Sequence, residues 1–403
     1  MLRPDALIKR ADELVDEKQV LQLSRELIRI PSVTRKEHRI SRVIYQKLDK
    51  WGLRPKNIPV EGYGPTVTAE IGDRKAPSVV FNGHMDTVEV MSGWKHDPFG
   101  AKIEDGLMYG LGSLDMKCGL ASMMLAFRAL SECGLPESSR VMFQAVTGEE
   151  ATSAGTRTLI SRGAFKGAKA VIVGEGFGGL RAITRGRRGG SYFNISVKGR
   201  AAHGSTPENG ISAISDAAMI VQALNDMKMR RAKGLMSDDF ERLKESQTVL
   251  RISGGTGTLT VPEDCSIRVI RCTIPGKDSG VEREIRRKIA SLRLRSKVNV
   301  DLIKGDAELF QPYVTSANSR LVRTASRCLQ LVTGSPPMLV IGKSEADDNR
   351  IAHDLGLPVI CIGPGELGRL CRYHQCEEAI TIAQLGPATK VYFATAMELC
   401  EKG

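Results

Sequence analysis

The sequence predicts an α/β protein in which a catalytic domain with a mostly parallel sheet carries an inserted ferredoxin-like βαββαβ domain. Two observations support this fold class. Short apolar segments alternate with helical patterns in the first and last parts of the chain, which is typical of a largely parallel sheet. Between them the order is strand, helix, strand, strand, helix, strand, which is that of the ferredoxin-like unit. With 403 residues, the chain is long enough for two or three domains.

Residues 1–184 are predicted to form the first part of the catalytic domain. Amphipathic periodicity indicates two helices before the first strand, with a break at Pro31. Continuous apolar runs then indicate buried strands that alternate with a helix. The expected elements are helices over 4–28, 36–51 and 119–131 and strands over 78–81, 140–146 and 168–173.

Residues 185–306 are predicted to form the inserted domain, and residues 307–403 the second part of the catalytic domain. Alternation of apolar and polar residues over 191–198 indicates a strand with one buried face. The other elements expected in the insertion are helices over 210–227 and 281–294 and strands over 248–252, 266–273 and 298–303. The elements expected after the insertion are helices over 316–333 and 381–399 and a strand over 358–362.

The composition argues against a membrane protein and against a secreted one. Hydrophobic residues make up 41% of the chain, and no run approaches the ~18–20 apolar residues that span a bilayer. The charged start of the sequence lacks the apolar core of a secretory signal. The nine cysteines are irregularly spaced and form no CxxC pair, so we expect reduced thiols in a cytoplasmic protein.

The net charge of +12, from 58 basic and 46 acidic residues, is compatible with an anionic small substrate or with nucleic acid. The basic residues are spread out and are not interleaved with aromatic residues, which make up only 5% of the chain. The sequence contains no helix-turn-helix, RRM or zinc-finger pattern. A solvated basic surface is therefore favoured. Two roles remain open for one basic cluster: a site for an anionic substrate, or a solvated hinge. The cluster consists of Arg185, Arg187 and Arg188.

Histidines and carboxylates follow the predicted strands of the catalytic domain. In an open α/β sheet, ligands bind at the edge where the strands end, so side chains that follow different strands meet there. We therefore expect a functional site at this edge. The side chains placed in this way are His84, Asp115, Glu149, Glu150, Glu175 and His374.

Two histidines and several carboxylates form a ligand set that suits zinc, or cobalt or manganese in its place. Unpaired carboxylates at one edge would repel one another, and a divalent ion removes that repulsion. Two ions that share a bridging carboxylate can hold a water and a carbonyl oxygen. The adjacent pair Glu149-Glu150 suits a division of roles in which one carboxylate binds a metal and the other stays free as a base. The residues thus predict a two-metal hydrolytic site.

Five segments, in order along the chain, resemble the M20 metallopeptidase family. They are Gly83-His84-Met85-Asp86-Thr87-Val88, Gly112-Ser-Leu-Asp115-Met116-Lys117, Thr147-Gly-Glu149-Glu150, residues 199–210 (GRAAHGSTPENG) and the late His374. The family includes acetylornithine deacetylases, succinyl-diaminopimelate desuccinylases, aminoacylases and carboxypeptidase G2-like enzymes. The resemblance extends over nearly the whole chain. It implies a zinc-peptidase-like catalytic domain with an inserted lid or dimerisation domain.

The resemblance also implies which residues hold the metal ions. His84 and Glu175 would hold one ion, and Glu150 and His374 would hold the other. Asp115 would bridge both ions, and the peptide bond that follows it resembles the cis bond of the family. The implied cofactors are two divalent ions, most simply zinc, with cobalt or manganese as alternatives.

Four further residues receive roles by the same resemblance. Asp86 would orient His84, and Glu149 would be the general base that later passes its proton to the leaving amine. His203 would reach the site from the partner subunit of a homodimer and stabilise the oxyanion. Arg271 lies where the family places an arginine that holds a substrate carboxylate.

The predicted function is metal-dependent hydrolysis of an amide bond in a small carboxylate-bearing substrate, such as an N-acyl amino acid, by a bridging water that Glu149 activates. A metal-dependent di- or tripeptidase or carboxypeptidase is the enzymatic alternative. A sensor of amino-acid derivatives on the same scaffold is the non-enzymatic alternative. Departures from the family pattern leave the acyl group and the amino acid open. No Asn lies two or three residues before Pro262, where the family often has one. Cys118 replaces a usual Gly, and Glu345-Ala-Asp347-Asp348 stands where Gly-Thr-Asp-Ala is common.

Overall fold

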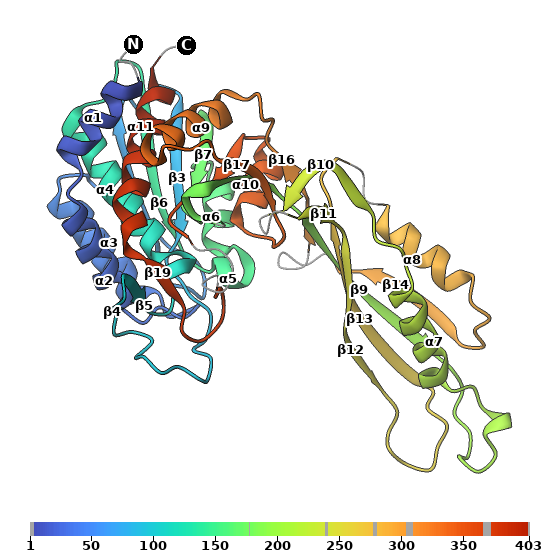
Figure 1. Cartoon of the computed structure of the whole chain (residues 1–403). Helices are drawn as coiled ribbons and strands as arrows, with labels where there is room; N and C mark the ends of the chain where they lie inside the picture. The colour runs from blue at the N-terminus through green and yellow to red at the C-terminus, as the bar shows by residue number, and fades with distance from the viewer. Residues whose placement is uncertain are drawn as a thin grey trace.

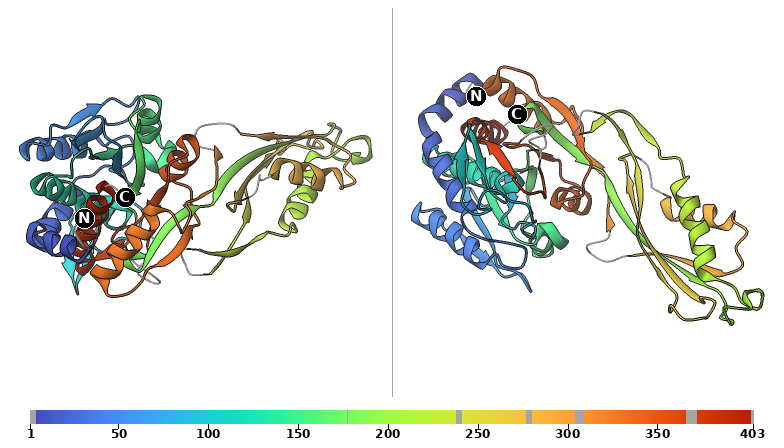
Figure 2. Two further views of the ribbon diagram at one scale, coloured as in Figure 1. Left: turned by 90° about the horizontal axis from the view of Figure 1, so that it is seen from above. Right: turned by 60° about the horizontal axis from the view of Figure 1, so that its bottom comes forward.

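The chain folds into a large part and an elongated part (Figure 1). The structure is a computed structural model that describes residues 4–176, 178–237, 241–276, 280–303, 309–365 and 372–401. The large part holds both termini, and the elongated part projects from one side of it. The two views of Figure 2 show the same arrangement, with the elongated part extending away from the helices that cover the large part.

The large part is built on one mixed sheet whose centre is parallel, as predicted. Among the described residues the strand order is β1-β2-β6-β3-β7-β18-β8-β17-β10-β11, with β16 beside β8. β3 pairs in parallel with both β6 and β7, and β7 pairs in parallel with β18. The strands are β1 (Lys56–Ile58), β2 (Thr66–Gly72), β3 (Ser78–His84), β6 (Arg140–Val146), β7 (Ala168–Val173), β8 (Ala182–Arg187), β10 (Arg231–Ser237), β11 (Arg242–Lys244), β16 (Tyr313–Val314), β17 (Met338–Gly342) and β18 (Val359–Cys361).

Strand β3 lies at the middle of the core, and all seven of its residues are buried. Because side chains alternate along a strand, Val79 and Phe81 pack into the core on one face of the sheet and Val80 into the core on the other. On the first face, α4 (Cys118–Cys133) and α11 (Leu385–Cys400) contact each other and β3. Both helices are buried on most sides, which explains why their sequences are apolar almost throughout.

The remaining helices of the large part cover the two faces of the sheet. The segment predicted as one helix over 4–28 forms two helices, because Asp16 accepts a hydrogen bond from the Lys18 backbone N–H and caps the second helix. The helices are α1 (Pro4–Leu14), α2 (Glu17–Ile28), α3 (His38–Lys50), α5 (Glu149–Thr152), α6 (Ala154–Ser161), α9 (Arg320–Thr333) and α10 (Asp347–Leu355), with 3₁₀ turns over Gly179–Arg181 and Ile382–Gln384.

The elongated part has the predicted ferredoxin-like arrangement. Its antiparallel sheet has the order β12-β13-β9-β14, and β15 extends the pairing along β9. Two helices pack on this sheet around a separate apolar core. The elements are β9 (Gly189–Lys198), a 3₁₀ turn (Pro207–Asn209), α7 (Ala213–Asn225), β12 (Ser246–Gly254), β13 (Asp264–Thr273), α8 (Val281–Ala290), β14 (Lys297–Leu302) and β15 (Leu309–Phe310).

The hairpin of β10 and β11 is a feature that the sequence did not predict. β10 leaves the elongated part and pairs in parallel with β17 of the large sheet, with Met236 opposite Val340. Its sequence is short of apolar residues, as expected of a strand near the sheet edge, so no strand pattern was visible. The domain boundaries at 185 and 306 remain predictions. β8, which crosses the first of them, belongs to the large sheet.

A three-stranded sheet joins early and late parts of the chain. Its order is β19-β5-β4, with β4 at Lys102–Glu104, β5 at Leu107–Tyr109 and β19 at Ala379–Thr381. This pairing fixes the segment after His374 beside the segment before Asp115. Within the described chain, we find no helix with the length and apolar character that crossing a membrane requires.

Candidate metal centre

Three neighbouring strands of the large sheet deliver the first site residues. β3 lies between β6 and β7, and all three run in parallel, so their carboxyl ends meet at one edge. His84 is the last residue of β3. Glu149 and Glu150 open the short helix that follows β6, and Glu175 lies two residues beyond β7. The predicted edge of the sheet therefore does gather these side chains.

Asp115 lies between the two histidines. One of its carboxylate oxygens is 2.9 Å from His84 Nε2, and the other is 3.5 Å from His374 Nε2. Glu175 Oε1 is 3.9 Å from His84 Nε2, and Glu150 Oε2 is 2.9 Å from His374 Nε2. Three groups of donor atoms result, and the atoms of each group lie within 4.8 Å of one another: His84, Asp115 and Glu175; Asp115, Glu150 and His374; and His84, Glu149 and Glu150. The first two groups share Asp115. Nitrogen and oxygen donors in two groups that share one carboxylate fit a pair of divalent ions.

The two histidines differ in exposure. The side chain of His84 is 1% exposed, whereas that of His374 is 51% exposed. The site is therefore closed at the sheet and open at His374, which leaves this side for a substrate to approach. The structure thus brings all five predicted metal ligands together from distant parts of the sequence.

The segment that carries Asp115 has an unusual backbone. Residues 113–117 form a tight turn, and the Asp115–Met116 peptide bond is cis, as the family resemblance predicts. The Met116 side chain is buried against Gly83, where an added Cβ would lie only 2.5 Å from the Met116 methyl carbon. A larger residue before His84 would therefore require the Met116 methyl group to move.

Asp86 connects His84 to the pair Glu149-Glu150. The Nδ1 atom of His84 is 3.0 Å from the backbone carbonyl of Asp86, and since a carbonyl only accepts, Nδ1 must be the donor. Nε2 then faces the site, where it can offer its lone pair to a metal ion that displaces its proton. The Asp86 carboxylate accepts hydrogen bonds from the backbone N–H groups of Glu149 and Glu150 at 3.2 Å and from Thr34 Oγ1 at 2.9 Å. Its burial raises the pKa of Asp86.

Burial and charge alter the pKa values of the site in the absence of metal. Burial raises the pKa of Glu149 well above its ordinary value, and the neighbouring carboxylates add to this effect. Hydrogen bonds to Asp115 and Glu150 raise the pKa of His374 to about 10. For His84, burial acts to lower the pKa, but Asp115, Glu149 and Asp86 together raise it well above its ordinary value. The metal-free site therefore holds protons that bound cations would displace.

Arg187 is a member of the site that sequence analysis did not identify. It is fully buried, forms an ion pair with Glu175, and bonds the carboxylate of Asp348 at 2.7 Å. Ser344 accepts a further hydrogen bond from it at 2.8 Å. Burial raises the pKa of Glu175 to about 7, and the Arg187 charge opposes that rise. Of the two roles left open for Arg187, neither the substrate site nor the solvated hinge is correct. The basic segment alone could not reveal the buried ion pair, because the partner carboxylates lie elsewhere in the sequence.

The structure does not bring His203 to this centre. His203 is exposed, and its Nδ1 accepts a hydrogen bond from the backbone N–H of Ser205 at 3.2 Å. It lies in the loop that follows β9, and Figure 1 shows this loop at the outer end of the elongated part. Its predicted contribution from a partner subunit remains a prediction.

Arg271 lies on β13 and is 1% exposed. Its guanidinium bonds the Glu245 carboxylate at 2.8 Å and Glu284 at 3.4 Å. A substrate carboxylate would have to compete with Glu245 for this group. Binding of substrate by Arg271 therefore also remains a prediction.

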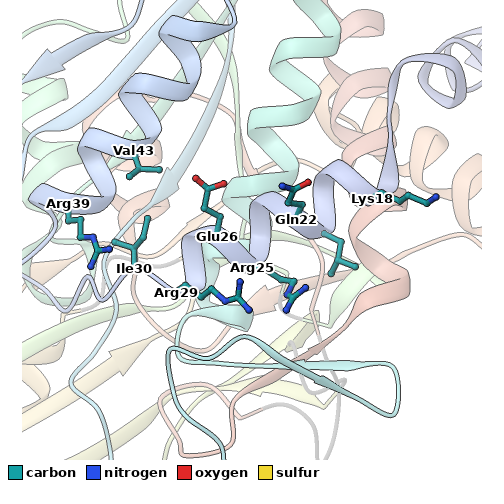
Figure 3. Close-up of a pocket in the computed structure, with 9 residues that line it drawn as sticks. Lys18, Gln22, Arg25, Glu26, Arg29, Ile30, Arg39 and Val43 are labelled. Atoms are coloured by element: carbon teal, nitrogen blue, oxygen red, sulfur yellow. The ribbon is translucent and has the colours of Figure 1, made fainter.

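A groove of about 690 Å³ lies between α2 and α3 (Figure 3), and no residue of the metal centre lines it. Arg25 and Arg29, one helical turn apart, project to the same side of α2, as their i,i+4 spacing requires. Lys18 and Arg39 add two further cations to the lining. This groove contributes to the basic surface of the protein and is separate from the candidate site.

Known proteins resemble this chain along nearly its whole length. Succinyl-diaminopimelate desuccinylase 2 of Shewanella loihica is 28% identical over 93% of this chain and 98% of its own length. The N-formyl-4-amino-5-aminomethyl-2-methylpyrimidine deformylase of Bacillus subtilis is 24% identical over 88% of this chain and 86% of its own. Aminopeptidase PepT of Bacillus cereus shares the fold with a TM-score of 0.77, at 23% identity over 96% of this chain and all of that one.

A dinuclear metal-binding peptidase of Bacillus subtilis also shares the fold, with a TM-score of 0.71 and 16% identity over 95% of this chain and 98% of that one. Residues 80–398 match the family described as peptidase family M20/M25/M40. This match spans the metal-ligand groups in the large part and the inserted segment between them. The chain belongs to peptidase family M20/M25/M40, and it is a metal-using hydrolytic enzyme of the metallopeptidase type.

Proposed function

We propose that the protein is a two-metal amidohydrolase that removes an acyl group from a small, carboxylate-bearing amine such as an amino acid. The observation that carries this proposal is the position of Asp115, whose two oxygens face the two histidines and join two groups of metal-ligating atoms. A single-metal site would not need this arrangement. The names of the curated relatives denote removal of a succinyl or a formyl group, which supports acyl removal over cleavage of a free peptide.

The two ions would be held by the residues that the structure brings together. His84 and Glu175 would hold one, Glu150 and His374 the other, and Asp115 both. Zinc suits this set of imidazole and carboxylate donors, and cobalt or manganese would also fit. When bound, the ions supply Lewis-acid polarisation of the scissile carbonyl and lower the pKa of a water molecule.

Glu149 is the proposed general base. It lies beside the ligand atoms of His84 and Glu150, yet it is absent from the two groups that share Asp115. Its raised pKa suits a carboxylate that accepts a proton from the attacking water and then passes it to the leaving amine. The backbone N–H of Asp347 lies 3.3 Å from Glu149 Oε1 and fixes its orientation. Asp86 keeps the His84 lone pair towards the site.

A homodimer in which His203 of one subunit serves the centre of the other is part of this proposal. The edge strand β12 and the helix α7 that packs on it carry exposed apolar side chains, which suit an interface between two copies. These side chains are Ile214, Met219, Leu250 and Ile252. His203 would then stabilise the oxyanion, and Arg271 would bind the substrate carboxylate.

A cytoplasmic location also belongs to the proposal. The cysteines of the described chain carry free thiols, which is typical of a reducing compartment.

The test is amine release from acetyl-, succinyl- and formyl-amino acids and from unblocked dipeptides. Protein stripped with a chelator is assayed alone and after addition of zinc, cobalt or manganese. We expect metal to restore cleavage of acylated compounds, and the active acyl class then identifies the substrate group. Cleavage of unblocked peptides alone would replace the proposal by a peptidase. Two bound ions without any cleavage would favour a sensor.

A further inference from the structure

Glu378 is a buried carboxylate four residues after His374, and neither the family resemblance nor the proposed mechanism gives it a role. Its residue is 1% exposed, and its carboxylate faces the backbone of the segment that carries Asp115. Oε2 accepts a hydrogen bond from the Gly112 N–H at 3.0 Å. Oε1 accepts hydrogen bonds from the N–H groups of Leu114 at 2.7 Å and of Asp115 itself at 3.1 Å.

Three backbone donors that converge on one carboxylate fix the path of a segment without regular secondary structure. The dihedral angles of Asp115 are non-helical. Its N–H group and those of Gly112 and Leu114 need acceptors, because buried backbone donors are normally paired. The Glu378 side chain supplies the missing acceptors. The turn also depends on Lys117, which is fully buried and donates from Nζ to the Ile30 carbonyl at 2.8 Å. The Asp115 segment is therefore held from two directions.

The backbone of Glu378 strengthens the connection. Its carbonyl accepts a hydrogen bond from the Gly110 N–H at 2.9 Å, and the pairing of β19 with β5 follows directly. One short stretch of chain thus supplies two groups to the site. The imidazole of His374 can bind a metal ion, and Glu378 holds the backbone of Asp115 in place by hydrogen bonds. The position of one is tied to the position of the other through residues 374–378.

We propose that Glu378 is a positioning residue that holds the Asp115 carboxylate between His84 and His374, so that both halves of the metal centre form together. This inference rests on the proposed role of Asp115 as the shared ligand. Glu378 does not touch the metal-ligating oxygens and acts through the Asp115 backbone. Residues that orient ligands in this way typically change metal affinity by about 10–100-fold when they are replaced.

The test compares metal binding by the wild type, E378Q and E378D. Glutamine offers one acceptor oxygen, and its NH₂ group would face a backbone N–H, so at least one of the three hydrogen bonds is lost. Aspartate keeps the charge but is shorter by one methylene. We expect zinc to bind about 10–100-fold more weakly to both variants, measured by competition with a chromophoric chelator. Because E378D keeps the charge, weaker zinc binding by this variant would show that the position of the carboxylate matters and not its charge alone. If E378Q does not fold, E378D is the variant that is measured.

The matched control is D216N in the elongated part. Asp216 is also a buried carboxylate that accepts two backbone N–H bonds, from Arg295 at 3.0 Å and Ser296 at 2.7 Å. D216N should alter stability and leave the zinc affinity unchanged. Hydrogen exchange adds a direct readout, since the amides of Gly112, Leu114 and Asp115 should exchange faster in E378Q and not in D216N.

Two outcomes would overturn the inference in distinguishable ways. If the wild type binds two zinc ions and E378Q and E378D bind them as tightly, the positioning role is wrong while the proposed function stands. If the wild type binds neither zinc nor cobalt nor manganese, the proposed function fails, and the role of Glu378 fails with it.

Discussion

Removal of the metal ions should make the stability of the protein fall as the pH rises. Without metal, hydrogen bonds to Asp115 and Glu150 raise the pKa of His374 to about 10. A raised histidine pKa stabilises the fold fully below the unfolded pKa of about 6.5, and this contribution is lost as the pH rises towards 10. Burial raises the pKa of Glu175 to about 7, whereas the pKa of a glutamate in the unfolded chain is about 4.3. As the pH rises between these two values, the unfolded state ionises more readily than the folded state, so stability is lost here too. Both effects have the same sign between pH 6.5 and about 7, and above that range the His374 contribution continues to be lost.

Metal binding should have the opposite dependence. Each proposed ion binds one histidine, His84 or His374, and both have raised pKa values in the metal-free site. Displacing one proton per ion makes each Kd about tenfold tighter per pH unit, because protons and metal compete for the same lone pair. Tenfold corresponds to about 1.4 kcal/mol per ion. The stabilisation by two saturating ions should therefore grow by about 3 kcal/mol per pH unit near neutrality.

Calorimetric titration of stripped protein with zinc at pH 6.5, 7.5 and 8.5, in buffers of different ionisation enthalpy, counts the released protons. Thermal unfolding with and without zinc follows the stability. H353Q is the control, since His353 is exposed on α10 and should not alter the count. H374Q should release about one proton fewer and bind one ion fewer. A Kd that does not change between pH 6.5 and 8.5, or stripped protein that gains stability as the pH rises, would refute the reasoning.

Three further predictions concern single residues. H203A should lower kcat about 10²–10³-fold while two zinc ions remain bound, and loss of zinc instead would make His203 a ligand. R187M should lower the free energy of unfolding of the stripped protein by about 3–5 kcal/mol in denaturant titrations, because two buried carboxylates lose their cation. A change below about 1 kcal/mol would contradict that ion pair. R271K should raise KM with little change in kcat, because lysine keeps the charge towards Glu245 but loses the two-pronged geometry of the guanidinium. Loss of stability with an unchanged KM would make Arg271 purely structural.

Local patterns were sufficient to predict the strands that carry the site. β3, β6 and β7 are short, mostly apolar segments, and their buried positions follow from that. Because parallel strands end at one edge, the meeting of His84, Glu149 and Glu175 could be expected without knowledge of the tertiary fold. The inserted sheet could also be predicted from a local pattern. Its strands alternate between buried and more exposed residues, as a half-buried strand requires.

The features that the sequence did not predict depend on contacts between distant segments. The β10–β11 hairpin joins the large sheet at its edge and is mostly exposed, so selection for an apolar face is weak there. Arg187 is buried only because Glu175 and Asp348 lie beside it. The position of Glu378 shows the same limit, because its three hydrogen bonds link positions 263 to 266 residues apart. The local pattern of apolar and polar residues contains no information about contacts between such distant residues.

The most direct test of a two-metal hydrolase with a separate carboxylate base compares the wild type with E149Q. Both proteins are loaded with zinc, the bound metal is counted by mass spectrometry, and amine release from the best acylated substrate is followed. We expect two zinc ions per chain in both proteins and turnover about 10²–10⁴-fold lower in E149Q. Turnover that survives in E149Q, or loss of zinc together with activity, would contradict the assignment of Glu149 as a base that stands apart from the metal ligands.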